Sequence, residues 1–477
     1  MPRNQVWTRR LMIGRKLLLF IWLYAIGPLN STAPAAQEIK SVSDRAYQDG
    51  IIEKISGLLE EKYVFPDRAT KYAEEFGKKN QSGSYNALKD ASEFADKLTQ
   101  DLQNITGDKH IRLRLIETSD IGEKTESALH HPVRLFLLRN KENAGFFKLE
   151  WIDGKIGYLD IRRFYSPPES KDLFVAAMRF LANANAIIID LRENQGGSTD
   201  ILPFFCRYFL DYPTQLTSNY IREADFLQES WISKEIEGKP LTTVPLFLLT
   251  SQRTFSAAEW LAYDMKVRKR ATIVGEPTKG GAHSIDLFKI DDQFEIYIPT
   301  SRAINPVTGG NWEGTGVIPD VPVPSEAALD KAIELAKIAA DEHWQEKEKS
   351  LSAAVEEMDG QLSLAEKLFR ENKKDAAEAA LDSVFRIGNK QGLINEFFVN
   401  VLAYNYSSDQ DEEILCAILK KNIESFPKSS TAYDSLAYAY FSHGKKAAAI
   451  ECFKKVLELD PDNTNAKKMI QRLESEH

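Results

Sequence analysis

Cysteine is scarce in this sequence, since only Cys206, Cys416 and Cys452 occur among 477 residues. Three thiols cannot form the dense disulfide framework that stabilises small secreted domains, and at most one disulfide can form. None of the three belongs to a CxxC or His/Cys cluster that would predict a structural metal site. Because their neighbours are mostly apolar, we expect the cysteines to be packed and the fold to depend on its hydrophobic core.

A basic excess is also missing. Lys and Arg total 61 against 70 Asp and Glu, which gives a net charge of −9. Since nucleic-acid binding depends on positive charge that faces phosphate, nucleic acid is not an expected partner. Nucleotide-binding loops are absent too: no Walker A order occurs, and no Gly-x-Gly-x-x-Gly follows a predicted strand. The sequence therefore predicts no cofactor.

No apolar run has the length of about 20 residues that a transmembrane helix needs. The run Leu17–Leu29 is shorter, five basic residues precede it, and Ala33-Pro34-Ala35 follows it. This order is typical of a signal peptide that is cleaved after Ala35. An uncleaved membrane anchor is the alternative. We expect residues 1–35 to be a signal peptide and the mature chain, with a net charge of −14, to be exported to the periplasm or the extracellular space.

The sequence does contain clear changes of periodicity, and its length suggests about three domains. Residues 38–106 have helical spacing and predict a small helical N-terminal domain. In residues 107–325, strand-like runs such as Val133–Leu138 alternate with helical segments, which predicts an α/β core. Residues 326–350 predict a helix that ends in a polar linker, around Gln345–Ser350.

Residues 351–477 are helical in period and contain a repeat. One copy comprises Tyr433, Leu436, Ala437, Tyr440, Ala449, Phe453 and Pro461, and an earlier copy comprises Val399, Leu402, Ala403, Tyr406, Leu415, Leu419 and Pro427. This spacing resembles that of tetratricopeptide (TPR) repeats. A third, degenerate helix pair is expected at residues 362–387, because a stack needs about three repeats to bury its faces. An amphipathic bundle with accidental spacing is the alternative.

Three loops of the predicted α/β core have residues that suit chemistry. In Asp190–Gly197, a buried strand ends in paired glycines, whose N–H groups could face a ligand. In Thr250–Glu259, Ser256 precedes a helix and has the S-x-x-E spacing of a helix-capping box. The same position would place its hydroxyl beside free N–H groups that can stabilise an oxyanion. The third loop, Gly275–His283, has a glycine pair typical of close backbone contact.

Five segments occur in one order: Gly107–His110, Ile188–Gly197, Thr250–Glu259, Gly275–Gly281 and Glu313–Asp320. Together they resemble the tail-specific protease (C-terminal processing peptidase) family over residues 40–325, in particular the branch of interphotoreceptor retinoid-binding protein and the tricorn core. The resemblance implies a crotonase-like α/β core of ββα units, between the helical N-terminal domain and an all-α TPR array. It also implies serine peptidase chemistry on a peptide or protein substrate, with no metal.

The resemblance implies a role for each matching residue. Ser256 is expected to be the nucleophile, His110 the general base and Glu313 the carboxylate that supports the site. The residue types fit, because an imidazole can accept the serine proton near neutral pH and return it to the leaving amine. The oxyanion hole is expected to consist of the backbone N–H groups of Gly196, Gly197 and Ala257.

Two further residues are expected in the substrate cleft, His283 and Lys279. His283 is an alternative base. Lys279 lies two residues before the position at which another branch of the family has its lysine base, so a displaced lysine is a second alternative. Too few residues separate Leu115 from Ile156 for an inserted PDZ domain, so the TPR array is expected to bind peptides or partner proteins. A non-catalytic binder, or an adaptor acting through the TPR alone, stays open as another function.

Overall fold

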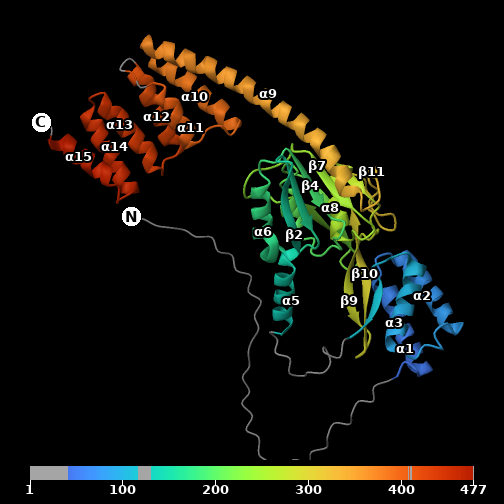
Figure 1. Cartoon of the computed structure of the whole chain (residues 1–477). Helices are drawn as coiled ribbons and strands as arrows, with labels where there is room; N and C mark the ends of the chain where they lie inside the picture. Colours follow the sequence, from blue (N-terminus) through green and yellow to red (C-terminus); the bar gives the residue numbers. More distant parts are fainter. Residues whose placement is uncertain (1–40, 117–129, 407, 409–410, 476–477) are drawn as a thin grey trace, which may run out of the picture.

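The computed structural model of the chain describes residues 41–116, 130–406, 408 and 411–475. Helical regions precede and follow a mixed α/β core along the chain, which confirms the predicted fold class (Figure 1). The predicted signal peptide, residues 1–35, lies outside the described residues. Within the described ranges, no helix is both long and apolar enough to cross a membrane.

Three helices form the N-terminal region: α1 (Arg45–Lys62), α2 (Pro66–Gln81) and α3 (Ala91–Thr106). The side chains of Asp44 and Asp90 accept backbone N–H groups at the starts of α1 and α3. The apolar faces of the three helices pack against an antiparallel sheet, where they share one buried cluster with its strands. In Figure 1 these helices lie beside β10.

The antiparallel sheet has the order β1-β10-β5-β6, and β9 pairs with β10 as well. Its long strand β10 therefore connects the N-terminal helices to the rest of the core. The strands of this sheet are β1 (Arg112–Leu115), β5 (Gln215–Ile221), β6 (Phe226–Trp231), β9 (His283–Lys289) and β10 (Phe294–Ile304).

The second sheet has the order β11-β8-β7-β4-β3-β2, and all its pairs are parallel except β2 with β3. Every residue of β3, β4 and β7 is buried, as is usual for strands of a parallel sheet that is covered on both faces. The strands β2 and β3 with the following helix α6 form a ββα unit. The strands are β2 (Phe146–Ile152), β3 (Ile156–Ile161), β4 (Ala186–Asp190), β7 (Leu246–Thr250), β8 (Thr272–Gly275) and β11 (Val321–Pro322).

Helices cover both faces of this second sheet. One face packs against α6 (Pro167–Phe180), α7 (Leu202–Cys206) and α8 (Ala257–Val267). The other face packs against α9 (Ala328–Arg370), which places four fully buried alanines on the sheet. These are Ala328, Ala332, Ala336 and Ala340, and their spacing of four residues puts them on one side of the helix.

Two local predictions are wrong. The expected linker around Gln345–Ser350 is the middle of α9, because its Glu- and Lys-rich sequence continues the helix as a solvated segment. The expected strand Val133–Leu138 lies within α5 (His130–Lys141), which the 3₁₀ turn Asn143–Gly145 follows. A short apolar run cannot be assigned to strand or helix by periodicity alone.

The C-terminal region consists of helices that pack in consecutive pairs, and α9 runs from the core to them (Figure 1). The end of α9 packs on α10, which gives the expected third helix pair at 362–387. The apolar residues of the predicted repeat are largely buried. All three cysteines are free. The helices are α10 (Lys374–Lys390), α11 (Glu396–Tyr404), α12 (Glu412–Ser425), α13 (Ser430–Ser442), α14 (Lys446–Leu459) and α15 (Thr464–Ser475).

Candidate active site

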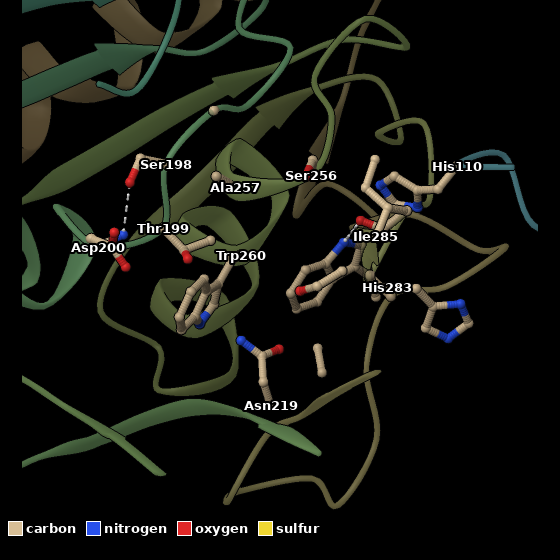
Figure 2. Close-up of a pocket in the computed structure, with 16 residues that line it drawn as sticks. His110, Ser198, Thr199, Asp200, Asn219, Ser256, Ala257, Trp260, His283 and Ile285 are labelled. Atoms are coloured by element: carbon tan, nitrogen blue, oxygen red, sulfur yellow. Dashed lines mark hydrogen bonds between the residues drawn. The ribbon is translucent and has the colours of Figure 1, made fainter. Parts of the chain in front are cut away.

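A pocket of about 350 Å³ lies between the loop after β4, the start of α8 and the strands β5, β9 and β10. Figure 2 shows Ser256 and Ala257 at the start of a helix, with Trp260 one turn further along the helix. Five of the eight residues predicted for the site line this pocket, and Gly196 and Glu313 are each next to a lining residue in the sequence. The pocket lining includes Gly197, Ser256, Ala257, His110 and His283, with Gly196 adjacent.

Ser256 occupies a strained position between β7 and α8. Its φ of 56° is unusual for a residue other than glycine, and such strain is typical of functional sites. Gly196 lies directly against this turn: a Cβ added to Gly196 would be 2.9 Å from both the Phe255 carbonyl oxygen and the Ser256 Cβ. Gly196, the first of the paired glycines after β4, therefore lies against the predicted nucleophile.

Glu259 connects the serine turn to the loop Gly275–His283. Its fully buried carboxylate accepts the backbone N–H of Ser256 at 2.8 Å, so the glutamate half of the predicted capping box is present. It also accepts the N–H groups of Gly280 and Gly281 and the hydroxyl of Thr278, at 2.6, 2.9 and 2.5 Å. Burial raises the pKa of Glu259. The sequence identified this residue only as a cap, because the loop donors are distant in the chain.

Two backbone N–H groups at the pocket are free to meet a ligand. Those of Gly197 and Ala257 have no acceptor among the described residues, and both residues line the pocket. The N–H of Gly196 differs, since it donates to Asn194 Oδ1 at 2.8 Å. The N–H groups of Gly197 and Ala257 can therefore form an oxyanion hole. The N–H of Gly196 cannot join them in this conformation, because it is hydrogen-bonded to Asn194.

His110 follows α3 and is held in the pocket wall by close packing. Its side chain is only 5% exposed, and neither ring nitrogen has a hydrogen-bond partner among the described residues. The ring centroid lies 4.5 Å from that of Phe255. A Cβ added to Gly281 would be 2.5 Å from His110 Cε1, so a glycine is required there for the imidazole to fit. The imidazole is thus buried and held in position by its packing, and both of its nitrogens are available for proton transfer.

The carboxylate nearest to His110 is Asp108 and not the predicted Glu313. The backbone N–H of His110 donates to Asp108 Oδ1 at 2.9 Å, and His110 Nδ1 lies 3.5 Å from the same oxygen. Glu313 Oε2 instead accepts the Ala282 N–H at 2.5 Å and lies 3.6 Å from His283 Nδ1. Asp108 is not among the site residues predicted from the sequence. The D-x-H spacing, typical of an Asx turn, was the signal that could have identified it.

His283 joins these two carboxylates. Its Nδ1 lies 2.5 Å from Asp108 Oδ2, so Asp108 is shared by two histidines. Burial alone would raise the pKa of Asp108, but contacts with His110 and His283 outweigh it and hold this pKa below its usual range. Burial and the charge of Asp108 together raise the pKa of Glu313. The aspartate is therefore the carboxyl group that stays ionised most readily in this network.

The same network has the donor types of a metal site. One ligand atom from each of Asp108, His283 and Glu313 lies within 4.8 Å of the other two, and zinc takes imidazole and carboxylate ligands. The three side chains also form a network of polar contacts by themselves, in which Asp108 and His283 are already paired.

Lys279 is not part of the pocket lining. Its ammonium lies 4.6 Å from the centroid of the Phe255 ring, and its backbone N–H donates to the Thr254 carbonyl. Among the described residues, Lys279 makes no hydrogen bond to Ser256 and does not line the pocket, whereas His110 does, so the geometry favours His110 over a displaced lysine as the base. Phe255 thus has a ring contact with each of the two candidate bases.

Three parts of the chain match models of known protein families. Residues 155–323 match peptidase family S41, and residues 34–144 match the N-terminal domain of peptidase S41 in eukaryotic IRBP. Residues 432–463 match the tetratricopeptide repeat.

Similar proteins include two processing proteases. The carboxyl-terminal-processing protease of a Picosynechococcus strain is 29% identical over 185 residues, which are 39% of this chain and 43% of that protein. Chloroplastic carboxyl-terminal-processing peptidase 1 of Arabidopsis thaliana is 27% identical over 196 residues, which are 40% of this chain and 39% of that protein. The match thus spans less than half the length of these relatives.

Solved structures of mature CPAF and of the tricorn protease are distantly similar. The TM-score is 0.44 for CPAF, at 14% identity over 63% of this chain and 98% of that chain. It is 0.40 for the tricorn protease, at 12% identity over 63% of this chain and 37% of that chain.

Proposed function

Because the chain belongs to peptidase family S41, the tail-specific proteases, and has C-terminal TPR repeats, we propose that it is a serine peptidase that uses Ser256 and His110. One observation carries the proposal: Ser256, His110 and two backbone N–H groups without acceptors are gathered at a single pocket. A nucleophile, a base and an oxyanion hole are the parts that acyl transfer requires.

The proposed reaction has two steps. His110 accepts the hydroxyl proton of Ser256 as the oxygen attacks the substrate carbonyl carbon, and it then gives this proton to the leaving amine as the peptide bond breaks. A water molecule hydrolyses the resulting acyl-enzyme, again with His110 as the base. The N–H groups of Gly197 and Ala257 stabilise the oxyanion in both steps, aided by the N-terminus of α8.

We assign Asp108 the role of supporting the base, with Glu313 acting at a greater distance through His283. Two distances support this assignment: Asp108 lies 3.5 Å from the His110 ring, whereas Glu313 contacts His283 instead. An ionised carboxylate beside the imidazole stabilises the imidazolium that forms when the serine proton is transferred. Glu313 also fixes the Ala282 backbone at the pocket.

A fluorophosphonate probe tests the proposal and separates it from a non-catalytic binder with the same fold. The probe is expected to label the full chain at Ser256, because an activated serine reacts with such electrophiles whereas an ordinary surface serine does not. Mass spectrometry of the labelled protein identifies the site. The Ser256→Ala variant should remain unlabelled, and a wild-type protein that resists the probe over the whole pH range would support the binder.

The TPR repeats are proposed to bind peptides or partner proteins. A chain that ends at residue 350 is expected to keep the labelling rate of the full chain, because the alanines of α9 that contact the sheet lie at positions 328–340. It is expected to lose binding of the proteins that the full chain retains on an affinity column. If binding and activity both survive the truncation, the repeats do not have this role.

Export to the periplasm or the extracellular space is proposed from the order of residues 1–35, which is typical of a signal peptide. N-terminal sequencing of the protein from its native source tests this proposal: a mature chain that begins after Ala35 supports it, and one that retains Met1 in the cytoplasm contradicts it.

A further inference from the structure

Two buried carboxylates beside the pocket lack a permanently charged partner. The side chains of Asp108 and Glu313 are 1% and 17% exposed, and among the described residues neither makes an ion pair with a lysine or an arginine. Their ion-pair contacts are with the imidazoles of His110 and His283, which are charged only when protonated. Because burying negative charge without a paired cation costs free energy, this cluster favours a positively charged ligand.

The ligand atoms of the cluster converge from three distant segments of the chain. His283 Nδ1 lies 2.5 Å from Asp108 Oδ2 and 3.6 Å from Glu313 Oε2. Tetrahedral zinc with ligands at about 2.1 Å places them about 3.4 Å apart. The separation between His283 and Glu313 is close to this value, and the contact between Asp108 and His283 reaches it by widening about 1 Å.

Two further polar groups of this cluster are buried and have no hydrogen-bond partner among the described residues. One is Glu313 Oε1, and the other is the ring of His110, whose Nδ1 lies 3.5 Å from Asp108 Oδ1. Unsatisfied acceptors of this kind are the groups that a metal ion can coordinate. His110 and His283 line the pocket and lie at the same end of it in Figure 2, so an ion can reach the cluster from the cavity.

We propose that Asp108, His283 and Glu313 form an inhibitory zinc site, with the fourth position open to His110 or a water molecule. Imidazole together with carboxylates suits zinc, whereas calcium and magnesium prefer oxygen ligands in larger shells. The Zn²⁺ ion replaces the proton between Asp108 and His283, and this proton leaves to solvent. The proposed hydrolysis needs no metal. The inhibition rests on the proposed peptidase function, but the binding of zinc does not.

Zinc at this position is expected to prevent the activation of Ser256. Asp108 is the carboxylate assigned to stabilise the His110 imidazolium, and its charge is compensated once it coordinates a metal ion. The positive charge of the ion also opposes protonation of the neighbouring imidazole. Saturating zinc is therefore expected to slow fluorophosphonate labelling by at least about 100-fold, since loss of the supporting carboxylate alone costs serine proteases about 10⁴-fold.

Isothermal titration of zinc chloride into the full-length Ser256→Ala protein tests the site without catalysis. Glu313→Gln and His283→Gln, each made in that protein, are expected to weaken zinc binding at least about tenfold, with melting temperatures to show that they are folded. His343→Gln is the matched control, because His343 lies in α9, outside the pocket lining, with Glu346 one turn further along. It is expected to keep the affinity within about twofold.

Fluorophosphonate labelling of the wild-type chain measures the inhibition, because protein substrates such as casein bind divalent ions themselves. Zinc is expected to slow the labelling, EDTA to restore it, and magnesium at the same concentration to leave it unchanged. Each variant that retains Ser256 is compared by the ratio of its labelling rates with and without zinc. The activity lost through the substitution itself cancels in this ratio.

Two results would overturn the zinc site. One is equal zinc affinity with and without the Glu313→Gln and His283→Gln substitutions, and the other is a wild-type chain that is labelled at the same rate in saturating zinc. A wild-type chain that resists the probe without zinc would instead count against the peptidase. The titration would then still decide whether Asp108, His283 and Glu313 bind the metal.

Discussion

Peptide hydrolysis is expected to fall by about 10⁴- to 10⁶-fold when Ser256 is replaced by alanine, which is the loss typical of removing a serine nucleophile. The hydroxyl is the atom that forms the acyl bond, and no other nucleophile in the pocket occupies the start of α8 beside the free N–H of Ala257. The N–H groups at Gly197 and Ala257 would remain, so a small residual rate above the uncatalysed one is expected.

Folding is expected to survive this substitution. The backbone N–H of Ser256, which binds Glu259, is unchanged, and alanine tolerates the positive φ about as poorly as serine does. The measurement is kcat/KM on β-casein together with the melting temperature. Ser198→Ala is a matched control, because Ser198 is another hydroxyl of the pocket and should lose less than about tenfold. An equal loss of kcat/KM in both variants would contradict the assignment of Ser256 as the nucleophile.

The parts of the fold that the sequence predicted are those with a local pattern. The apolar runs that form β4 and β7 are bounded by turn residues, and the serine after β7 lies at a helix start as its capping spacing predicted. The repeat that forms α13 and α14 has a fixed spacing of apolar residues. Each of these features needs only neighbours in the chain, so the sequence alone specifies it.

The parts that could not be predicted depend on contacts between distant segments. Asp108 meets His283 across 175 residues of chain, and nothing near residue 108 signals this partner. Glu259 binds the loop Gly275–His283 in the same way, although its local capping role was visible. The interior of α9 around Gln345–Ser350 was mistaken for a linker, because a solvated helix and a polar linker have similar composition.

The identity of the supporting carboxylate leads to the second large effect: Asp108→Asn is expected to lower kcat/KM by about 10³- to 10⁴-fold. Asp108 is buried, its pKa is held below the usual range by contacts with two histidines, and it is therefore ionised when His110 accepts the serine proton. Asparagine keeps the size and one oxygen for the His110 N–H, but it removes the negative charge that stabilises the imidazolium.

Glu313→Gln is the matched acid-to-amide change, and it is expected to cost only about tenfold, because Glu313 contacts His283 and the Ala282 N–H rather than His110. Since burial and the charge of Asp108 already raise the pKa of Glu313, a neutral side chain at this position perturbs the network less than one at Asp108. The measurement is kcat/KM for both variants on β-casein, with melting temperatures to exclude unfolding. A larger loss of kcat/KM in Glu313→Gln than in Asp108→Asn would show that the glutamate supports the base. Asp108 would then only stabilise the turn before His110.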